Sequence, residues 1–327
     1  MQHLCTPDET RSLIASGAWL LLAGDEALLR SLPKGNWIGG TIPYFMTAEG
    51  GLHSTDRIFV TELPAATGAS IKVYDASSLP RIAQDHPGHG FTVLLIPAFS
   101  SIHAAFAQQV SEFPGIFDRP LVGWIAGVGL DQIGTVSPKV FDGLTGAGSD
   151  SHAVALQVEL AETDQADLDI VNLFVPGDGP EILFDSAGFA AGEVSIGGER
   201  RNLAAYLVEH GIDTKLPLVA DYHGAMVNVS IQKVDEAAGT VAFYAPVFPG
   251  VGYRLASPLG DYRSTFAGQF KSEGAPVAFS YNCILNYAYA GLEGQSTGRL
   301  LGPMTFGEIA YMLLNQTAVH LTIARDA

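Results

Sequence analysis

Short continuous apolar runs alternate along the chain with segments whose apolar residues recur every three or four positions. The runs at 18–23, 92–96 and 121–128 contain almost no polar residue, as in strands that are buried on both faces of a sheet. Segment 102–113 instead places its large apolar residues on one face, which is typical of an amphipathic helix. The pattern therefore predicts mixed α and β structure, with mixed β-sheets flanked by helices.

Capping signals mark two of the predicted helices. Thr6 can accept a hydrogen bond from the amide of Glu9, whose side chain can reach back to Thr6, and Pro7 suits the first helical position. We expect a short helix from there to about residue 16. Residues 202–210 predict a second helix, and Gly211 is placed to end it.

The stretch 176–198 is rich in glycine and proline, and it separates the chain into two parts. Beyond it the alternation of helix and strand patterns starts again. With 327 residues the chain exceeds what one ordinary core organises. We therefore expect two halves, residues 1–198 and 199–327, each with mixed β-sheets flanked by helices.

Acidic residues outnumber basic ones by 34 to 17, which gives a formal net charge of -17. No cluster of lysine and arginine offsets this charge, so nucleic acid is not expected as a partner. The N-terminus lacks the basic region of a signal peptide, and the run 18–23 is too short to span a bilayer. The cysteines are Cys5 and Cys283, and we expect no structural disulfide. The sequence predicts a cytoplasmic protein without membrane insertion.

Polar residues gather on an apolar framework in the last quarter of the chain. Asn282 and Cys283 end a predicted strand, and Thr305 and Glu308 lie where a new helix is predicted to begin. Side chains and helix amides can converge on a ligand at such a junction. His223 follows the predicted strand 216–220 and precedes a glycine that permits a turn. We expect these residues to border a small-molecule site.

Each candidate also has a purely structural interpretation. Cysteine is among the most commonly buried residues, so Cys283 can simply pack in the core. A carboxylate at the first turn of a helix is favoured by the helix dipole, which accounts for Glu308 without a ligand. His223 can be a histidine of a surface loop.

The remaining histidines and glycines predict neither a metal site nor a phosphate site. His86-Pro87-Gly88-His89 is the closest approach to metal-ligand spacing, and its proline and glycine make it a turn first. The glycines at 123, 127 and 129 do not match the dinucleotide-binding or P-loop pattern. No residue pattern identifies a cofactor.

The order of motifs in the second half resembles the FIST family of intracellular sensory domains. In that family a helix and a Pro-Leu strand precede a hairpin, a Pro-Gly turn and an Arg-Leu pair, and a Gly-Glu-Ile helix start and an Asn-x-Thr pair follow. The similar segments here are 202–211, Leu216-Pro217-Leu218, 227–244, Phe248-Pro249-Gly250, Arg254-Leu255, Gly307-Glu308-Ile309 and Asn315-Gln316-Thr317. Two residues separate Ser280 from Cys283, which departs from the Ser-x-Cys segment of the family.

The resemblance implies an N-terminal FIST-like domain, 1–198, and a C-terminal one, 199–327, that bind a small ligand and signal through a separate partner protein. A binding role is favoured over catalysis. Two alternatives stay open, a cysteine-dependent enzyme with Cys283 as nucleophile and His223 as base, and a haem-based gas sensor.

Overall fold

The computed structural model of the protein describes residues 2–222, 224–262, 264–265, 277–298 and 300–325. The chain folds into two compact units and crosses between them more than once. Unit 1 consists of Met1–Val171, Phe266–Leu313 and Ala318–Ala327, and unit 2 consists of Asn172–Thr265 and Leu314–Thr317. The expected division into domains 1–198 and 199–327 stays a prediction.

Strands dominate the secondary structure, with 45% of the residues in strands and 17% in helices. Within the described ranges the strands form five mixed or antiparallel sheets, and no described α-helix exceeds nine residues. The prediction of two halves with mixed β-sheets flanked by helices is therefore wrong. The helices are short and few, and the segment that begins at Glu308, predicted as the start of a helix, pairs instead with the distant strand β9 (Leu121–Ala126).

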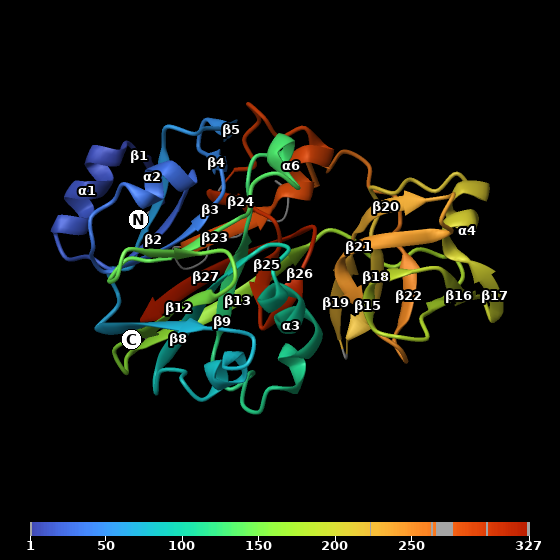
Figure 1. Cartoon of the computed structure of the whole chain (residues 1–327), viewed down its shortest axis with the longest axis horizontal. Helices are drawn as coiled ribbons and strands as arrows, with labels where there is room; N and C mark the ends of the chain where they lie inside the picture. Colours follow the sequence, from blue (N-terminus) through green and yellow to red (C-terminus); the bar gives the residue numbers. More distant parts are fainter. Residues whose placement is uncertain (1, 223, 263, 266–276, 299, 326–327) are drawn as a thin grey trace. The chain divides into compact units, whose positions relative to one another are not determined.

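Unit 1 holds three six-stranded sheets, apart from the terminal residues of β13, β26 and β27 (Figure 1). The first sheet has the order β1 (Gln2–Cys5), β6 (Ile58–Glu62), β2 (Leu20–Gly24), β3 (Trp37–Thr41), β10 (Val140–Asp142) and β11 (Ala147–Ser149). The second has the order β26 (Met312–Leu314), β25 (Glu308–Ala310), β9 (Leu121–Ala126), β8 (Gly90–Pro97), β12 (Ala153–Glu159) and β7 (Gly68–Tyr74). The third has the order β13 (Asp164–Asn172), β27 (Thr317–Arg325), β23 (Val277–Cys283), β24 (Gly302–Thr305), β4 (Tyr44–Thr47) and β5 (Gly50–His53).

Unit 2 holds the other two sheets. One has the order β17 (Glu199–Asn202), β16 (Glu193–Ile196), β14 (Ile182–Leu183), β22 (Gly252–Leu255), β18 (Leu218–Tyr222) and β19 (Ala225–Val229), and the other has the order β15 (Gly188–Ala191), β21 (Thr240–Val247) and β20 (Ile231–Asp235). The α-helices of the two units are α1 (Pro7–Ala15), α2 (Glu26–Arg30), α3 (Ser101–Gln109), α4 (Leu203–Glu209) and α6 (Ile284–Ala290). Short 3-10 helices are η1 (Leu79–Ala83), η2 (Val110–Glu112) and η3 (Leu130–Gln132).

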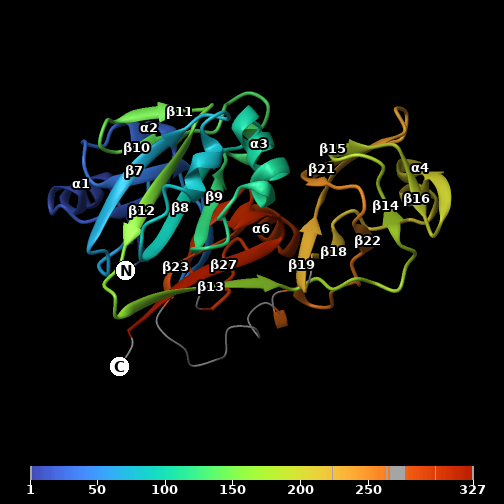
Figure 2. The ribbon, with the colours of Figure 1, turned by 90° about the horizontal axis from the view of Figure 1, so that it is seen from below.

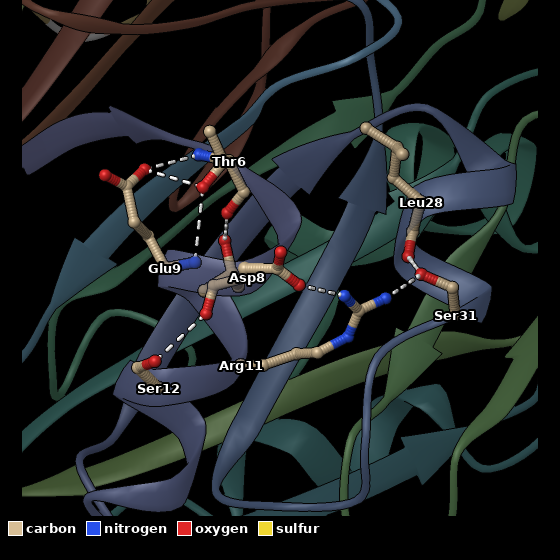
Figure 3. A network of polar contacts seen from close by, with 8 residues as sticks. Thr6, Asp8, Glu9, Arg11, Ser12, Leu28 and Ser31 are labelled. Atoms are coloured by element: carbon tan, nitrogen blue, oxygen red, sulfur yellow. Dashed lines mark hydrogen bonds and ion pairs between the residues drawn. The ribbon is translucent and has the colours of Figure 1, made fainter.

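The capping box predicted at the start of the chain is confirmed (Figure 3). The Thr6 hydroxyl accepts a hydrogen bond from the Glu9 amide at 3.3 Å, and Glu9 accepts one from the Thr6 amide at 2.8 Å. Arg11 on α1 contacts Asp8 at 2.6 Å and Ser31, just beyond α2, at 3.3 Å. Apolar residues of α1 and α2 pack with Leu20 and neighbouring residues of the first sheet, so the two helices cover one of its faces (Figure 1).

The strands β8 and β9 form a parallel pair in the second sheet, and Figure 2 shows them beside β12. Gly123 of β9 has a φ of 147°, and a Cβ at this position would lie 1.8 Å from the carbonyl oxygen of Leu94 in β8. The buried hydroxyl of Tyr281 accepts a hydrogen bond from the Gly123 amide at 2.7 Å and donates one to the Ile309 carbonyl at 3.0 Å. Tyr281, which belongs to β23, thereby joins the third sheet to the second.

The helix predicted to begin near residue 307 is absent. Glu308–Ala310 instead forms β25, which pairs antiparallel with β9. Tyr311 then adopts a φ of 62°, which breaks the extended backbone before β26 begins. Ile309 and Leu313 are buried in the sheet, so pairing with a strand almost two hundred residues earlier decides the conformation here.

Candidate functional site

A cleft of about 360 Å3 opens in unit 1 where three strands end. β2 and β3 run parallel to each other, and β9 ends beside β3, because the Gly127 amide donates to the Thr41 carbonyl at 2.7 Å. The residues that line the cleft lie at or beyond the carboxyl ends of these strands. They are Gly24, Asp25, Glu26, Ala27 and Arg30 after β2, Thr41, Ile42 and Pro43 after β3, and Gly127, Val128, Gly129, Gln132, Val136 and Ser137 after β9.

Local sequence signals explain why the chain turns away at each of these strand ends. Asp25 ends β2 and caps α2, since its carboxylate accepts the Ala27 amide at 2.9 Å. Pro43 follows β3 and cannot donate to a continuing strand. After β9, Gly127 leaves room for a neighbour, because a Cβ there would lie 2.2 Å from the ring of Phe306. At Gly127 the cleft is therefore lined by backbone that packs directly on the ring of Phe306.

Charged side chains at the cleft form a connected group. Glu26 Oε1 accepts from Arg30 at 2.6 Å, and Glu26 Oε2 accepts from Lys139 at 2.7 Å. Partial burial raises the pKa of the Glu26 carboxyl, but the hydrogen bonds from Lys139 and Arg30 outweigh it and hold the pKa below its ordinary value. The Arg30 guanidinium also lies over the ring of Phe141, 5.7 Å from its centroid.

The structure brings four of the five predicted site residues together within unit 1. Asn282 and Cys283 end β23 as predicted, and Cys283 lies opposite Thr305 in the parallel pairing of β23 with β24. The Thr305 hydroxyl lies 3.3 Å from the Asn282 carbonyl and 3.1 Å from Glu308 Oε1. The exposed fraction of each of these residues is 4% or less. They form a buried polar cluster, and their contact with a ligand stays a prediction.

The expected position of Glu308 at the start of a helix is wrong, since it begins a strand, and the dipole argument for it no longer applies. His223 lies outside the described residues. Cys283 is a buried thiol that does not belong to a disulfide, and Asn286 of α6 donates to Asn282 at 2.7 Å beside it. The Cys283 thiol is only 1% exposed, and a nucleophilic role for it stays a prediction.

The buried polar cluster is connected to the cleft through Phe306. Phe306, the residue between Thr305 and Gly307, donates its amide to the Ile125 carbonyl at 3.0 Å, and its ring packs on Gly127. The Thr305 hydroxyl also reaches the Gly307 carbonyl at 3.1 Å, which fixes the turn that carries Phe306. The cluster thus holds the turn whose Phe306 ring packs on the cleft residue Gly127.

A second depression of about 450 Å3 lies in unit 1 near the amino ends of β8 and β9. Its arginine and its histidine already have partners within the protein. Arg119 donates to the Gly88 carbonyl at 2.8 Å, and His89 Nε2 lies 2.7 Å from the Asp164 carbonyl. Ligands of open sheets bind beyond the carboxyl ends of parallel strands, so the cleft is the stronger candidate. In the ranges that the structure describes, no group of three or more His, Cys, Asp or Glu residues could hold a metal ion.

Sequence reasoning missed the residues that line the cleft. Three local signals were present: the cap at Asp25, the proline at 43 and the glycines at 127 and 129. Each signal marks a turn by itself. Only the pairing of β2 with β3 and the link from Gly127 to Thr41 bring the three turns to one place.

The fold and site define a mostly β protein of two compact units, with a cleft of small-molecule size at strand ends in unit 1. Residues 5–324 match a family of unknown function, DUF6976, and the chain belongs to this family. The assignment to the FIST family is therefore wrong, because DUF6976 spans nearly the whole chain and no FIST region is matched. No curated protein matches the chain. Among the described residues, no helix has the length and apolar character needed to cross a membrane.

Proposed function

We propose that this protein binds a small molecule in the cleft of unit 1. The observation that carries the proposal is a cavity of about 360 Å3, which falls within the range of small-molecule sites, at the carboxyl ends of strands. Apolar side chains such as Ile42, Val128 and Val136 line it together with a few polar groups, the mixture usual for such sites. Transmission of a ligand signal to a separate protein, and a cytoplasmic location, stay predictions.

The support behind the cleft favours a preformed site. The Gly127 amide bonds to the end of β3, and Phe306 packs on the other side of Gly127. Thr305 and Glu308 hold the turn of Phe306 from within the core. A site built on strand ends with such support needs little rearrangement to accept a ligand, which reduces the entropic cost of binding.

The proposal is tested by obstructing the cleft. Ser137 lines the cleft and is exposed, so Ser137→Trp places an indole in or across the cavity without disturbing the core. Ile133→Trp is the matched control, because Ile133 lies in the same segment, is 42% exposed and does not line the cleft.

The measurement is a titration of the full chain with a fragment library, followed by NMR chemical shifts. We expect fragments that shift resonances of cleft residues in the wild type and in Ile133→Trp, and that lose this effect in Ser137→Trp. Fragments whose binding survives Ser137→Trp, or the lack of any fragment that binds at the cleft, would contradict the proposal.

A further inference from the structure

The acceptors and the donors that line the cleft differ in how many of them already have a hydrogen-bond partner within the protein. Both oxygens of the Glu26 carboxylate are engaged by cations, at 2.6 Å and 2.7 Å. Gln132 Oε1 accepts from the Gly129 amide at 3.2 Å, and Asp25 Oδ1 accepts from the Ala27 amide at 2.9 Å. Most side-chain acceptors that line the cleft are therefore satisfied within the described part of the protein, and the exceptions are the second oxygen of Asp25 and the Ser137 hydroxyl.

The donors at the cleft show the opposite pattern. Arg30 uses Nη2 for Glu26, and across the described parts of the chain its Nε and Nη1 groups have no protein acceptor. The Thr41 hydroxyl, 3% exposed, accepts from the Lys139 amide at 2.9 Å and retains its own hydrogen for donation. The cleft thus offers more donors than acceptors to a guest.

The geometry of Arg30 points in the same direction. Glu26, Arg30, Lys139 and Asp25 together carry no net charge, so the preference must come from the spare donors of Arg30 and Thr41. Glu26 and the ring of Phe141 hold the Arg30 guanidinium in place, and its planar fork matches a carboxylate or a phosphate. The net charge of -17 opposes long-range attraction of an anion, so the selectivity must come from direct contact.

We propose that the ligand of the cleft is a small molecule with an apolar body and an anionic head, a carboxylate or a phosphate, which Arg30 and Thr41 bind. This inference rests on the proposed function, because it names the ligand class of the same cleft. The apolar body would lie against Ile42, Pro43 and Val136, and the head would take the spare donors.

The test uses a library of matched pairs, in which each carboxylic acid is accompanied by its primary amide. Binding to the full chain is measured by NMR titration for the wild type, Arg30→Gln and Arg11→Gln. Arg11 is the matched control, since it forms a similar exposed contact with Asp8 on α1 and lies outside the cleft. Phosphate monoesters of related alcohols distinguish a phosphate head from a carboxylate.

We expect acids to bind at the cleft about tenfold or more tightly than their amides, the scale of a charged hydrogen bond. Arg30→Gln should remove this preference, and Arg11→Gln should keep it. Acids and amides that bind the cleft equally well would overturn the anionic ligand class and leave the proposed function standing. Lack of binding by every pair, or binding that persists in Ser137→Trp, would overturn the proposed function itself.

Discussion

Replacement of Phe99 by glycine and, separately, by alanine measures the backbone strain stored in the turn between β8 and α3. Phe99 has a φ of 63°, and 54% of the residue is exposed. The left-handed region costs a residue with a Cβ about 1–2 kcal/mol, whereas glycine enters it readily. Glycine also loses more chain entropy on folding than alanine, by about 0.4–1 kcal/mol. We therefore expect Phe99→Gly to be more stable than Phe99→Ala by roughly 0.5–1 kcal/mol.

The comparison isolates the backbone because both variants lose the same phenyl ring. That ring meets Phe306 edge-on, with centroids 6.0 Å apart, so both variants lose this contact equally. The Phe99 amide still donates to His103 Nδ1, 3.3 Å away, in either variant. The side-chain contributions therefore cancel in the difference between the two free energies of unfolding.

The assay is urea-induced unfolding of the two variants, followed by circular dichroism at constant pH. Ser16 supplies the control pair, because it has a φ of -70° and alanine there should be more stable than glycine by about 0.5–1 kcal/mol. If the glycine variant is the more stable one at residue 99 and the alanine variant is the more stable one at residue 16, the result supports backbone strain at Phe99. Phe99→Ala unfolding at the same urea concentration as Phe99→Gly, or at a higher one, would refute the reasoning.

Two further predictions concern the core of unit 1. Gly123→Ala should destabilise the protein by on the order of 4 kcal/mol or more, because its Cβ would lie 1.8 Å from the Leu94 carbonyl oxygen; a thermal melt like that of the wild type would contradict this. Burial lowers the pKa of His103 to about 4, so the unfolded chain binds the proton more tightly and stability should fall by up to about 3 kcal/mol as the pH decreases from about 6.5 to 4. Urea unfolding at several pH values should show a smaller slope for His103→Gln, and an unchanged slope would exclude His103 as the cause.

The sequence located several elements of the fold correctly because their signals are local. Thr6 and Glu9 lie three residues apart, so their capping box defines the start of α1 wherever that helix packs. The continuous apolar runs marked β8 and β9 as buried strands. The end of β23 at Cys283 also followed from the pattern.

The assignment to the FIST family failed because its motifs are local as well. A Pro-Gly turn or a Gly-Glu-Ile segment reflects a local requirement of the backbone, such as a tight turn, and many unrelated folds share that requirement. A series of such motifs in the right order therefore looks more specific than it is. The match to DUF6976 covers residues 5–324, nearly the whole chain, and replaces that assignment.

The sequence by itself determined caps, turns and buried strand runs, since each depends on residues within a few positions of one another. Tertiary structure alone decided that Glu308 pairs with Trp124 in a sheet instead of opening a helix. It also decided that the turns after β2, β3 and β9 meet around one cleft. Strand pairing joins residues that are distant in the chain, and the sequence of an amphipathic segment does not specify which strand it pairs with. The cleft therefore cannot be predicted before the pairing of the strands is known.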